Sequence, residues 1–190
     1  MKTKDNIIYE SLKLFSILGF EAVSTRMIAK AVHGSDALIY KHFKNKQEIL
    51  DTIVAICTER FLSKRQAIDF SHICWEDAEK ICMDMFEFQT EDEWIVLFRR
   101  LLILEQFKNE KMAQLYRKFF IDSILDDLAL LFEKLMVNEY LKPGNPKIYA
   151  MELYAPFFMY HTLNQEKELL RKELKIHVSY FEKNYRNDRR

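Results

Sequence analysis

The residues of this chain that could carry chemistry lie close together, between positions 24 and 46. Most have hydroxyl, basic or aromatic side chains, which bind phosphate oxygens and the edges of bases. The candidates are Ser24, Thr25, Arg26, Ser35, Asp36, Ala37, Tyr40, Lys41, His42 and Lys46. The sequence has no Gly-rich phosphate loop, Ser/His/Asp set or metal-binding quartet, so no catalytic residue, metal or cofactor is expected. This pattern favours binding of nucleic acid over catalysis.

Short helices are predicted to position these residues. The apolar positions of the first recur at helical spacing: Ile7, Ile8, Leu12, Phe15 and Leu18. Gly19 follows where a C-terminal cap needs a positive backbone angle, so this helix is predicted to end at Leu18. A second helix is predicted to start at Ser24 or Thr25, because either hydroxyl can accept bonds from the free amides of its first turn.

A third short helix is predicted over residues 36–42. His33 and Gly34 interrupt the pattern of the second helix, and Ser35 supplies the next cap. Two short helices joined by so tight a turn make a helix-turn-helix, whose second helix lies in the major groove of DNA. The candidate residues are therefore expected to face a DNA duplex.

Residues 5–50 closely resemble the amino-terminal domain of the TetR/AcrR family of transcriptional regulators. The order and spacing that carry the resemblance are those of Phe15, Gly19, Phe20, Ile28, Ala29, Tyr40, His42, Phe43 and Lys46. Two positions depart from the family's pattern. Residues 33–35 read His-Gly-Ser where members usually have Gly-Val-Ser, and Ala37 stands where they usually have Gly.

The resemblance implies roles for individual residues. Tyr40, His42 and Lys46 match positions at which the family contacts phosphates. Lys41 lies on the exposed side of the third helix and is the best candidate for reading guanine, because Lys can donate to the acceptors on the major-groove edge of that base. Phe15 and Phe43 are expected in the core of the small domain, away from DNA.

Composition predicts an all-α chain with an uneven charge distribution. With 49% apolar residues but three Gly and three Pro among 190 residues, the chain can bury a core but has little material for turns or barrels. The formal net charge is zero, yet residues 1–50 hold eight Lys or Arg against five Asp or Glu. This split suits a DNA-binding module followed by an acidic domain.

Location is predicted from the absence of targeting signals. We expect no signal peptide and no membrane span, since charged residues interrupt every apolar run. Cys57, Cys74 and Cys82 show no CxxC spacing, which is typical of reduced thiols in a cytoplasmic protein.

About nine helices are expected in two domains. A helix-turn-helix domain is assigned to residues 1–48 and an effector-binding and dimerisation domain to residues 49–190. A cap at Asn45 opens a long fourth helix that runs to about Ile68 and joins the two domains. Later helices are predicted over residues 75–89, 93–107, 110–140, 147–163 and 167–185.

The second domain is predicted to bind a ligand and to dimerise. Its large side chains favour either a packed core or a pocket for an apolar or aromatic effector, and the resemblance favours the pocket. The candidate pocket residues are Met83, Phe86, Trp94, Phe98, Tyr116, Phe119, Tyr154 and Phe158. The last two helices carry an apolar stripe that predicts a homodimer through Phe157, Leu170, Leu174, Phe181 and Tyr185.

The resulting prediction is a homodimeric repressor that an effector releases from a palindromic operator in double-stranded DNA. The alternative is a helical-bundle small-molecule carrier or enzyme whose first three helices are merely structural. Asp126 and Asp127 are the nearest to a paired-carboxylate motif for such an enzyme. Glu87, Glu105, Asp122 and Glu152 could hold a cation if they were buried, but they are expected to be solvated or paired on outer faces.

Overall fold

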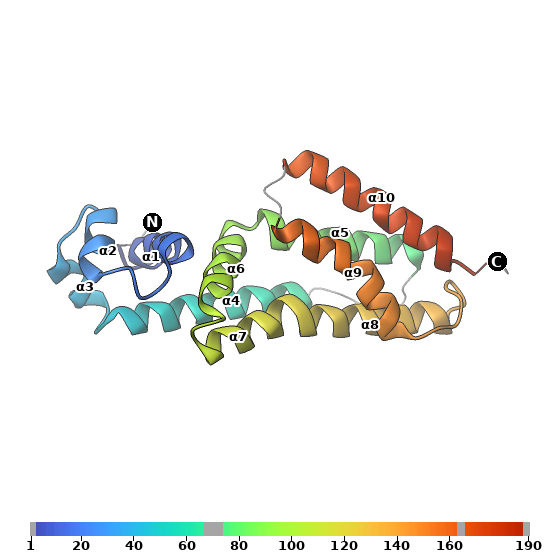
Figure 1. The fold of residues 1–190 in the computed structure, drawn as a ribbon, viewed down its shortest axis with the longest axis horizontal. Coiled ribbons are helices and arrows are strands. Elements are labelled where there is room, and N and C mark those ends of the chain that lie inside the picture. Colours follow the sequence, from blue (N-terminus) through green and yellow to red (C-terminus); the bar gives the residue numbers. More distant parts are fainter. Residues whose placement is uncertain (1–2, 67–73, 163–165, 188–190) are drawn as a thin grey trace. The chain divides into compact units, whose positions relative to one another are not determined.

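The computed structural model describes residues 3–66, 74–162 and 166–187, without the side chains of residues 160–162. These residues form α-helices, one π-helical turn and one isolated bridge between Leu141 and Arg186. The helices are α1 (Thr3–Leu18), α2 (Thr25–Ala31), α3 (Asp36–His42), α4 (Lys46–Gln66), α5 (Trp75–Glu91), α6 (Glu93–Glu105), α7 (Glu110–Arg117), α8 (Ser123–Val137), α9 (Pro146–Thr162) and α10 (Lys167–Tyr185) (Figure 1).

The all-α prediction is confirmed, and most helix ends fall within two or three residues of the predicted ones. The predicted seventh helix is a continuous stretch in which the π-helical turn Lys118–Asp122 separates α7 from α8. Counted in this way, the described residues form nine helical stretches, as expected. The predicted end of the fourth helix near Ile68 lies outside the described residues.

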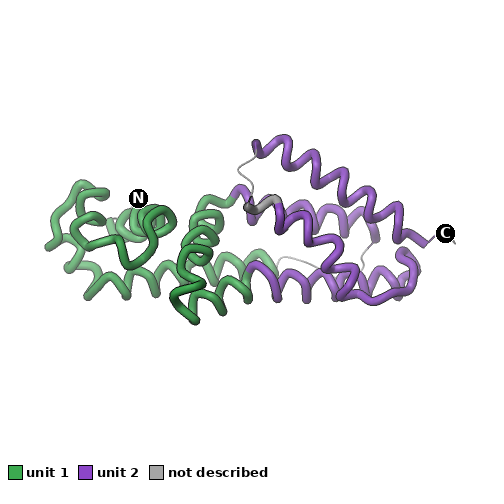
Figure 2. Tube along the Cα trace, viewed as in Figure 1, with its two compact units in different colours: residues 1–66, 92–119 green, residues 67–91, 120–190 purple. Residues whose placement is uncertain are grey.

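The chain divides into two compact units, shown in different colours in Figure 2. Unit 1 comprises residues 1–66 and 92–119, and unit 2 comprises residues 67–91 and 120–190. The predicted boundary between residues 48 and 49 separates a DNA-binding domain from an effector-binding and dimerisation domain, whereas the two units are defined by their compactness. The predicted boundary therefore stays a prediction.

Unit 1 is built on α1, which packs against α2, α4 and α6. Its core consists of fully buried apolar side chains from these helices and from α3, including Ile7, Leu12, Phe15, Ile28, Ile39, Ile49, Ile53, Phe98 and Leu101. Phe15 and Phe43 are buried, which confirms that they belong to the core.

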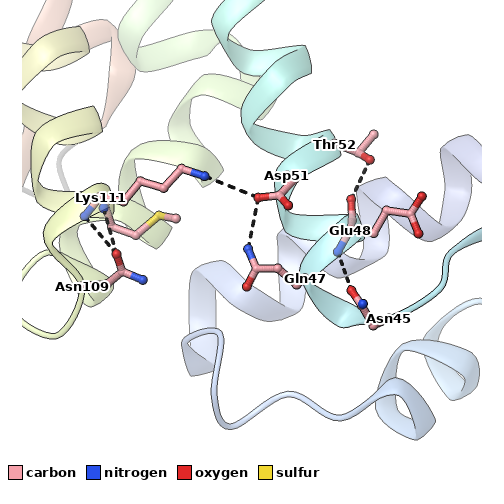
Figure 3. A network of polar contacts seen from close by, with 8 residues as sticks. Asn45, Gln47, Glu48, Asp51, Thr52, Asn109 and Lys111 are labelled. Carbon is pink, nitrogen blue, oxygen red and sulfur yellow. Dashed lines mark hydrogen bonds and ion pairs between the residues drawn. The ribbon is translucent and has the colours of Figure 1, made fainter.

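Side-chain caps fix the starts of α4 and α7 in unit 1 (Figure 3). Asn45 accepts a hydrogen bond from the Glu48 amide at 2.9 Å, as the predicted cap requires. Asn109 accepts bonds from the first amides of α7. Asp51 joins the two starts, because the Lys111 ammonium lies 3.6 Å from its carboxylate. Each cap satisfies amides that have no partner inside the helix.

Unit 2 packs α5, α8, α9 and α10 around one hydrophobic cluster. The core face of α10 carries Leu170, Leu174, Val178 and Phe181, all buried. Phe181 stacks on the ring of Phe132 with centroids 5.2 Å apart. The apolar stripe predicted on this helix is therefore present and contributes to the core of its own unit.

Candidate nucleic-acid interface

The helices α2 and α3 form the predicted helix-turn-helix. Ser24 rather than Thr25 caps α2, its hydroxyl accepting from the Met27 amide at 3.3 Å. Ser35 caps α3 in the same way by accepting from the Leu38 amide at 3.4 Å. These caps set the first turns of both helices, where amides and hydroxyls can also bind phosphate.

The turn between α2 and α3 explains one departure from the family's pattern. His33 has a φ of 53°, so it takes the left-handed conformation that the family's Gly usually provides. Gly34 donates to the Ala29 carbonyl at 2.8 Å and closes the helix end. A Cβ at Gly34 would lie 2.5 Å from a methyl of Leu38, so the Leu38 side chain fills the space of the missing valine.

The candidate base-reading residues are exposed to solvent. Arg26, Asp36, Ala37 and Lys41 are exposed on α2 and α3. Since Ile28 and Ile39 anchor the opposite faces of these helices in the core, the exposed faces are free to approach a DNA groove.

The candidate phosphate-binding residues at the end of α3 lie beside these. Tyr40 is 56% exposed, and His42 is half-buried in the last turn. Phe43 follows His42 as the buried C-cap residue and anchors this end of the helix to the core.

Lys46 has contacts within the chain that its sequence position did not predict. Its ammonium donates to the Phe20 carbonyl at 2.6 Å, lies 3.4 Å from the Glu21 carbonyl, and sits 4.2 Å from the centre of the Phe20 ring. It therefore ties the start of α4 to the segment between α1 and α2. An ammonium has three N–H donors, so one remains for a phosphate.

Glu105 binds the backbone amide of the same residue, Phe20. Its carboxylate accepts from the Phe20 amide at 2.9 Å, across 85 positions of sequence. Glu105 is 5% exposed, so the expectation that it lies on an outer face is wrong. Gly19 makes this contact possible, because its φ is 81° and a Cβ there would lie 2.8 Å from the Glu105 carboxylate.

The candidate pocket residues fall in both units. In unit 2, a cavity of about 20 Å³ is lined by Cys82, Met85, Phe86, Gln89, Ile124, Leu128, Leu153, Tyr154 and Phe157. Phe86 and Tyr154 were predicted pocket residues, and Met83 and Phe158 pack against the same cluster. Gln89 was not among the predicted pocket residues, although a polar residue on the core face of an amphipathic helix is a sign of a buried polar contact.

The other predicted pocket residues belong to unit 1. Trp94 packs against Tyr9, with ring centroids 5.6 Å apart, and under the guanidinium of Arg60. Phe119 stacks on Phe61 at 4.8 Å and also meets Phe98. Tyr116 is buried. None of these side chains lines the cavity of unit 2.

The candidate dimer residues lie inside unit 2. Phe157, Leu170, Leu174 and Phe181 are each 5% exposed or less. Tyr185 packs between the rings of Tyr149 and Phe181 and donates to Glu152. The opposite faces of α9 and α10 carry the exposed apolar side chains Ile148, Met151, Met159, Leu169, Ile176 and Tyr180.

Two other kinds of site were considered from the sequence, a pair of catalytic carboxylates and a metal site. Asp126 is exposed and Asp127 is buried, so the two carboxyl groups point to different places. Within the described ranges, no group of three or more His, Cys, Asp or Glu residues is arranged to hold a metal ion. None of the described helices is both long and apolar enough to span a membrane.

A family model described as bacterial regulatory proteins, TetR family, matches residues 7–53. The amino-terminal domain of this chain therefore matches the TetR family. This is a family of regulatory proteins rather than of enzymes. The HTH-type transcriptional regulator TcmR of Streptomyces glaucescens is 34% identical over 62 residues, which make up 33% of this chain and 27% of that protein. The matching segment thus spans about a quarter of the length of this relative.

Solved structures share the TetR fold over nearly the whole chain. SmeT, the repressor of the Stenotrophomonas maltophilia multidrug efflux pump SmeDEF, is 23% identical with a TM-score of 0.66, covering 98% of this chain and 91% of SmeT. A complex of SmeT with triclosan gives a TM-score of 0.68 at 20% identity, covering 100% and 94%. AibR, solved with isovaleryl coenzyme A and operator DNA, is 19% identical with a TM-score of 0.64, covering 94% and 97%.

Proposed function

We propose that this TetR-family protein is a homodimeric transcriptional repressor that a small effector releases from a palindromic operator. The observation that carries the proposal is the helix-turn-helix itself. Both of its helices are capped, their inner faces are anchored in the core, and basic and aromatic side chains stand exposed on α3. Binding of DNA places the protein in the cytoplasm, where the chromosome is accessible.

DNA recognition divides between two groups of residues. Tyr40, His42, the remaining N–H of Lys46 and the first turns of α2 and α3 position the domain on phosphates. Arg26 and Lys41 reach base edges, and Lys41 donates to guanine. Asp36 and Ala37 lie at the start of α3, where a recognition helix usually enters the groove.

Dimerisation uses the outer faces of α9 and α10. Six exposed apolar side chains on two helices that pack against each other favour an interface there, since large exposed apolar areas mark interaction sites. A two-fold axis would present the same face of each subunit and would pair two DNA-binding domains with a palindrome. The domain assignment of residues 1–48 to DNA binding and 49–190 to effector binding and dimerisation belongs to this proposal.

The effector binds in unit 2, at the cavity between α5, α8 and α9. Its present volume of about 20 Å³ accommodates about one water molecule, so a ligand must displace side chains. Met85 and the Phe rings of the lining can adapt in this way. Binding of triclosan by SmeT and of isovaleryl coenzyme A by AibR supports a small-molecule effector for this fold.

A titration of the purified protein against DNA tests the proposal. A duplex enriched from a random library by the protein should bind far more tightly than a scrambled duplex of equal length. Equal affinity for the two duplexes at physiological salt would reject sequence-specific recognition.

A further inference from the structure

The cavity of unit 2 has a lining that restricts the charge of its ligand. Its nine side chains include no Asp, Glu, Lys, Arg or His. Burial raises the pKa of the Cys82 thiol to about 12, so this group is uncharged at neutral pH. A buried ligand charge would find no opposite charge in this lining, which makes its desolvation unfavourable.

Two of the lining residues form one hydrogen-bonded pair. The Tyr154 hydroxyl lies 2.8 Å from the Phe120 carbonyl and 3.2 Å from Oε1 of Gln89. Both oxygens are acceptors and a hydroxyl has one proton, so Tyr154 shares its proton between Gln89 and Phe120.

This pair lies deep in an apolar environment. Gln89 is 3% exposed and Tyr154 is 6% exposed, and the rest of the lining consists of apolar side chains and the Cys82 thiol. The Phe120 carbonyl belongs to the π-helical turn 118–122, and such turns occur often at functional sites. A polar pair in this position contributes specificity, because a ligand must match its hydrogen bonds.

We propose that this cavity selects neutral, mainly apolar ligands with one hydroxyl group, such as alkylphenols, and that Gln89 and Tyr154 bind that hydroxyl. The inference rests on the proposed effector-binding role of unit 2 and names its ligand class. A phenol can donate to the Gln89 carbonyl oxygen, which has two lone pairs, while the ring lies among Met85, Phe86 and Phe157. A carboxylate of the same shape would bring an uncompensated charge.

Three compounds that differ at one ring substituent test the proposed ligand class. They are 4-ethylphenol, 4-ethyltoluene and 4-ethylbenzoate, each titrated calorimetrically into the full chain. We expect 4-ethylphenol to bind, and 4-ethylbenzoate to bind at least a hundredfold more weakly. Equal affinity for the phenol and the benzoate, or no binding of the phenol at millimolar concentration, would overturn the proposal.

Substitutions at Tyr154 and Gln89 test whether these two residues bind the ligand's hydroxyl group. Tyr154→Phe and Gln89→Met should each lower the ratio of phenol affinity to toluene affinity by about tenfold, and the toluene derivative controls for any change in cavity shape. Tyr149→Phe makes the same chemical change on α9 outside the cavity lining and should leave the ratio unchanged. Ratios unaffected by Tyr154→Phe and Gln89→Met would reject these residues as the recognition pair.

A DNA-binding measurement on the same protein distinguishes the ligand class of the cavity from the proposed role of the cavity as the effector site. The affinity for the selected duplex is measured with and without saturating 4-ethylphenol. Phenol binding that weakens DNA binding supports both proposals. Phenol binding without any effect on DNA affinity supports the ligand site and rejects its role as the effector site, since linkage requires each ligand to change the affinity of the other.

Discussion

Replacing Lys46 by Met should destabilise the protein even when no DNA is present. The change keeps most of the apolar stem but removes the ammonium that bonds the Phe20 carbonyl at 2.6 Å and lies over the Phe20 ring. A hydrogen bond with a charged donor contributes about 1.5–3 kcal/mol. A partly exposed cation–π contact contributes about 0.5–1 kcal/mol.

The net loss is smaller than the sum of these values, because the freed side chain regains rotamer entropy and the Phe20 carbonyl can bond water. We therefore expect the free energy of unfolding to fall by about 2 kcal/mol. For a chain of this length, that corresponds to a decrease of about 4–8 °C in the melting temperature. Lys44→Met provides the control, because Lys44 is an exposed Lys two positions away.

Thermal unfolding followed by circular dichroism at low protein concentration measures both variants. Identical melting temperatures for Lys46→Met and Lys44→Met would refute the assignment of Lys46 as a tether. A separate titration of DNA binding against salt tests the phosphate contact, which should lower the salt slope by about one unit when it is lost. The two results are independent, since the first is obtained without DNA.

Three other changes test the interface, the dimer and the core. Lys41→Ala should relax discrimination at one base step of each half-site at a cost of about 1–3 kcal/mol, and a uniform loss over all duplexes would instead assign Lys41 to the backbone. The double variant Ile176→Glu, Tyr180→Glu changes two exposed side chains of α10 and should give helical monomers in light scattering. Leu174→Glu changes a buried side chain and should instead unfold unit 2. A double variant that stays dimeric would place the interface elsewhere. Burial raises the pKa of the Cys82 thiol from 9.0 to about 12, so the folded state favours the protonated thiol. The resulting contribution to the free energy of unfolding is fully present below pH 9 and is lost as the pH rises toward 12. By pH 10 the wild type should therefore lose about 1.4 kcal/mol of unfolding free energy more than Cys82→Ala, and parallel pH profiles in denaturant titrations would contradict this.

Local patterns predicted the helices well, because their signals lie within a few residues. Gly19 ends α1 at Leu18, and the hydroxyls of Ser24 and Ser35 begin the next two helices. The helix predicted over residues 167–185 has those bounds in the structure. Caps and helical periodicity depend on neighbours up to four positions away, so they can be read from sequence.

Contacts between distant residues could not be predicted in this way. Glu105 meets the Phe20 amide across 85 positions, and nothing near Glu105 in the sequence marks a buried acceptor. The pairing of Gln89 with Tyr154 spans 65 positions and depends on how α5 and α9 pack. The stripe on α10 was predicted, but a stripe alone does not say whether it packs inside the subunit or against a second copy.

Selection of binding sites from a random duplex library tests the central claim most directly. The enriched duplexes should share an inverted repeat whose half-sites are centred about one helical turn apart or a multiple of it, as two linked reading helices require. The protein should bind such a duplex at least a thousandfold more tightly than a scrambled one, and Lys41→Ala should lose preference at one position of each half-site. Enrichment of no common sequence, or equal affinity for the selected and scrambled duplexes, would contradict the account of α2 and α3 as a DNA-reading element.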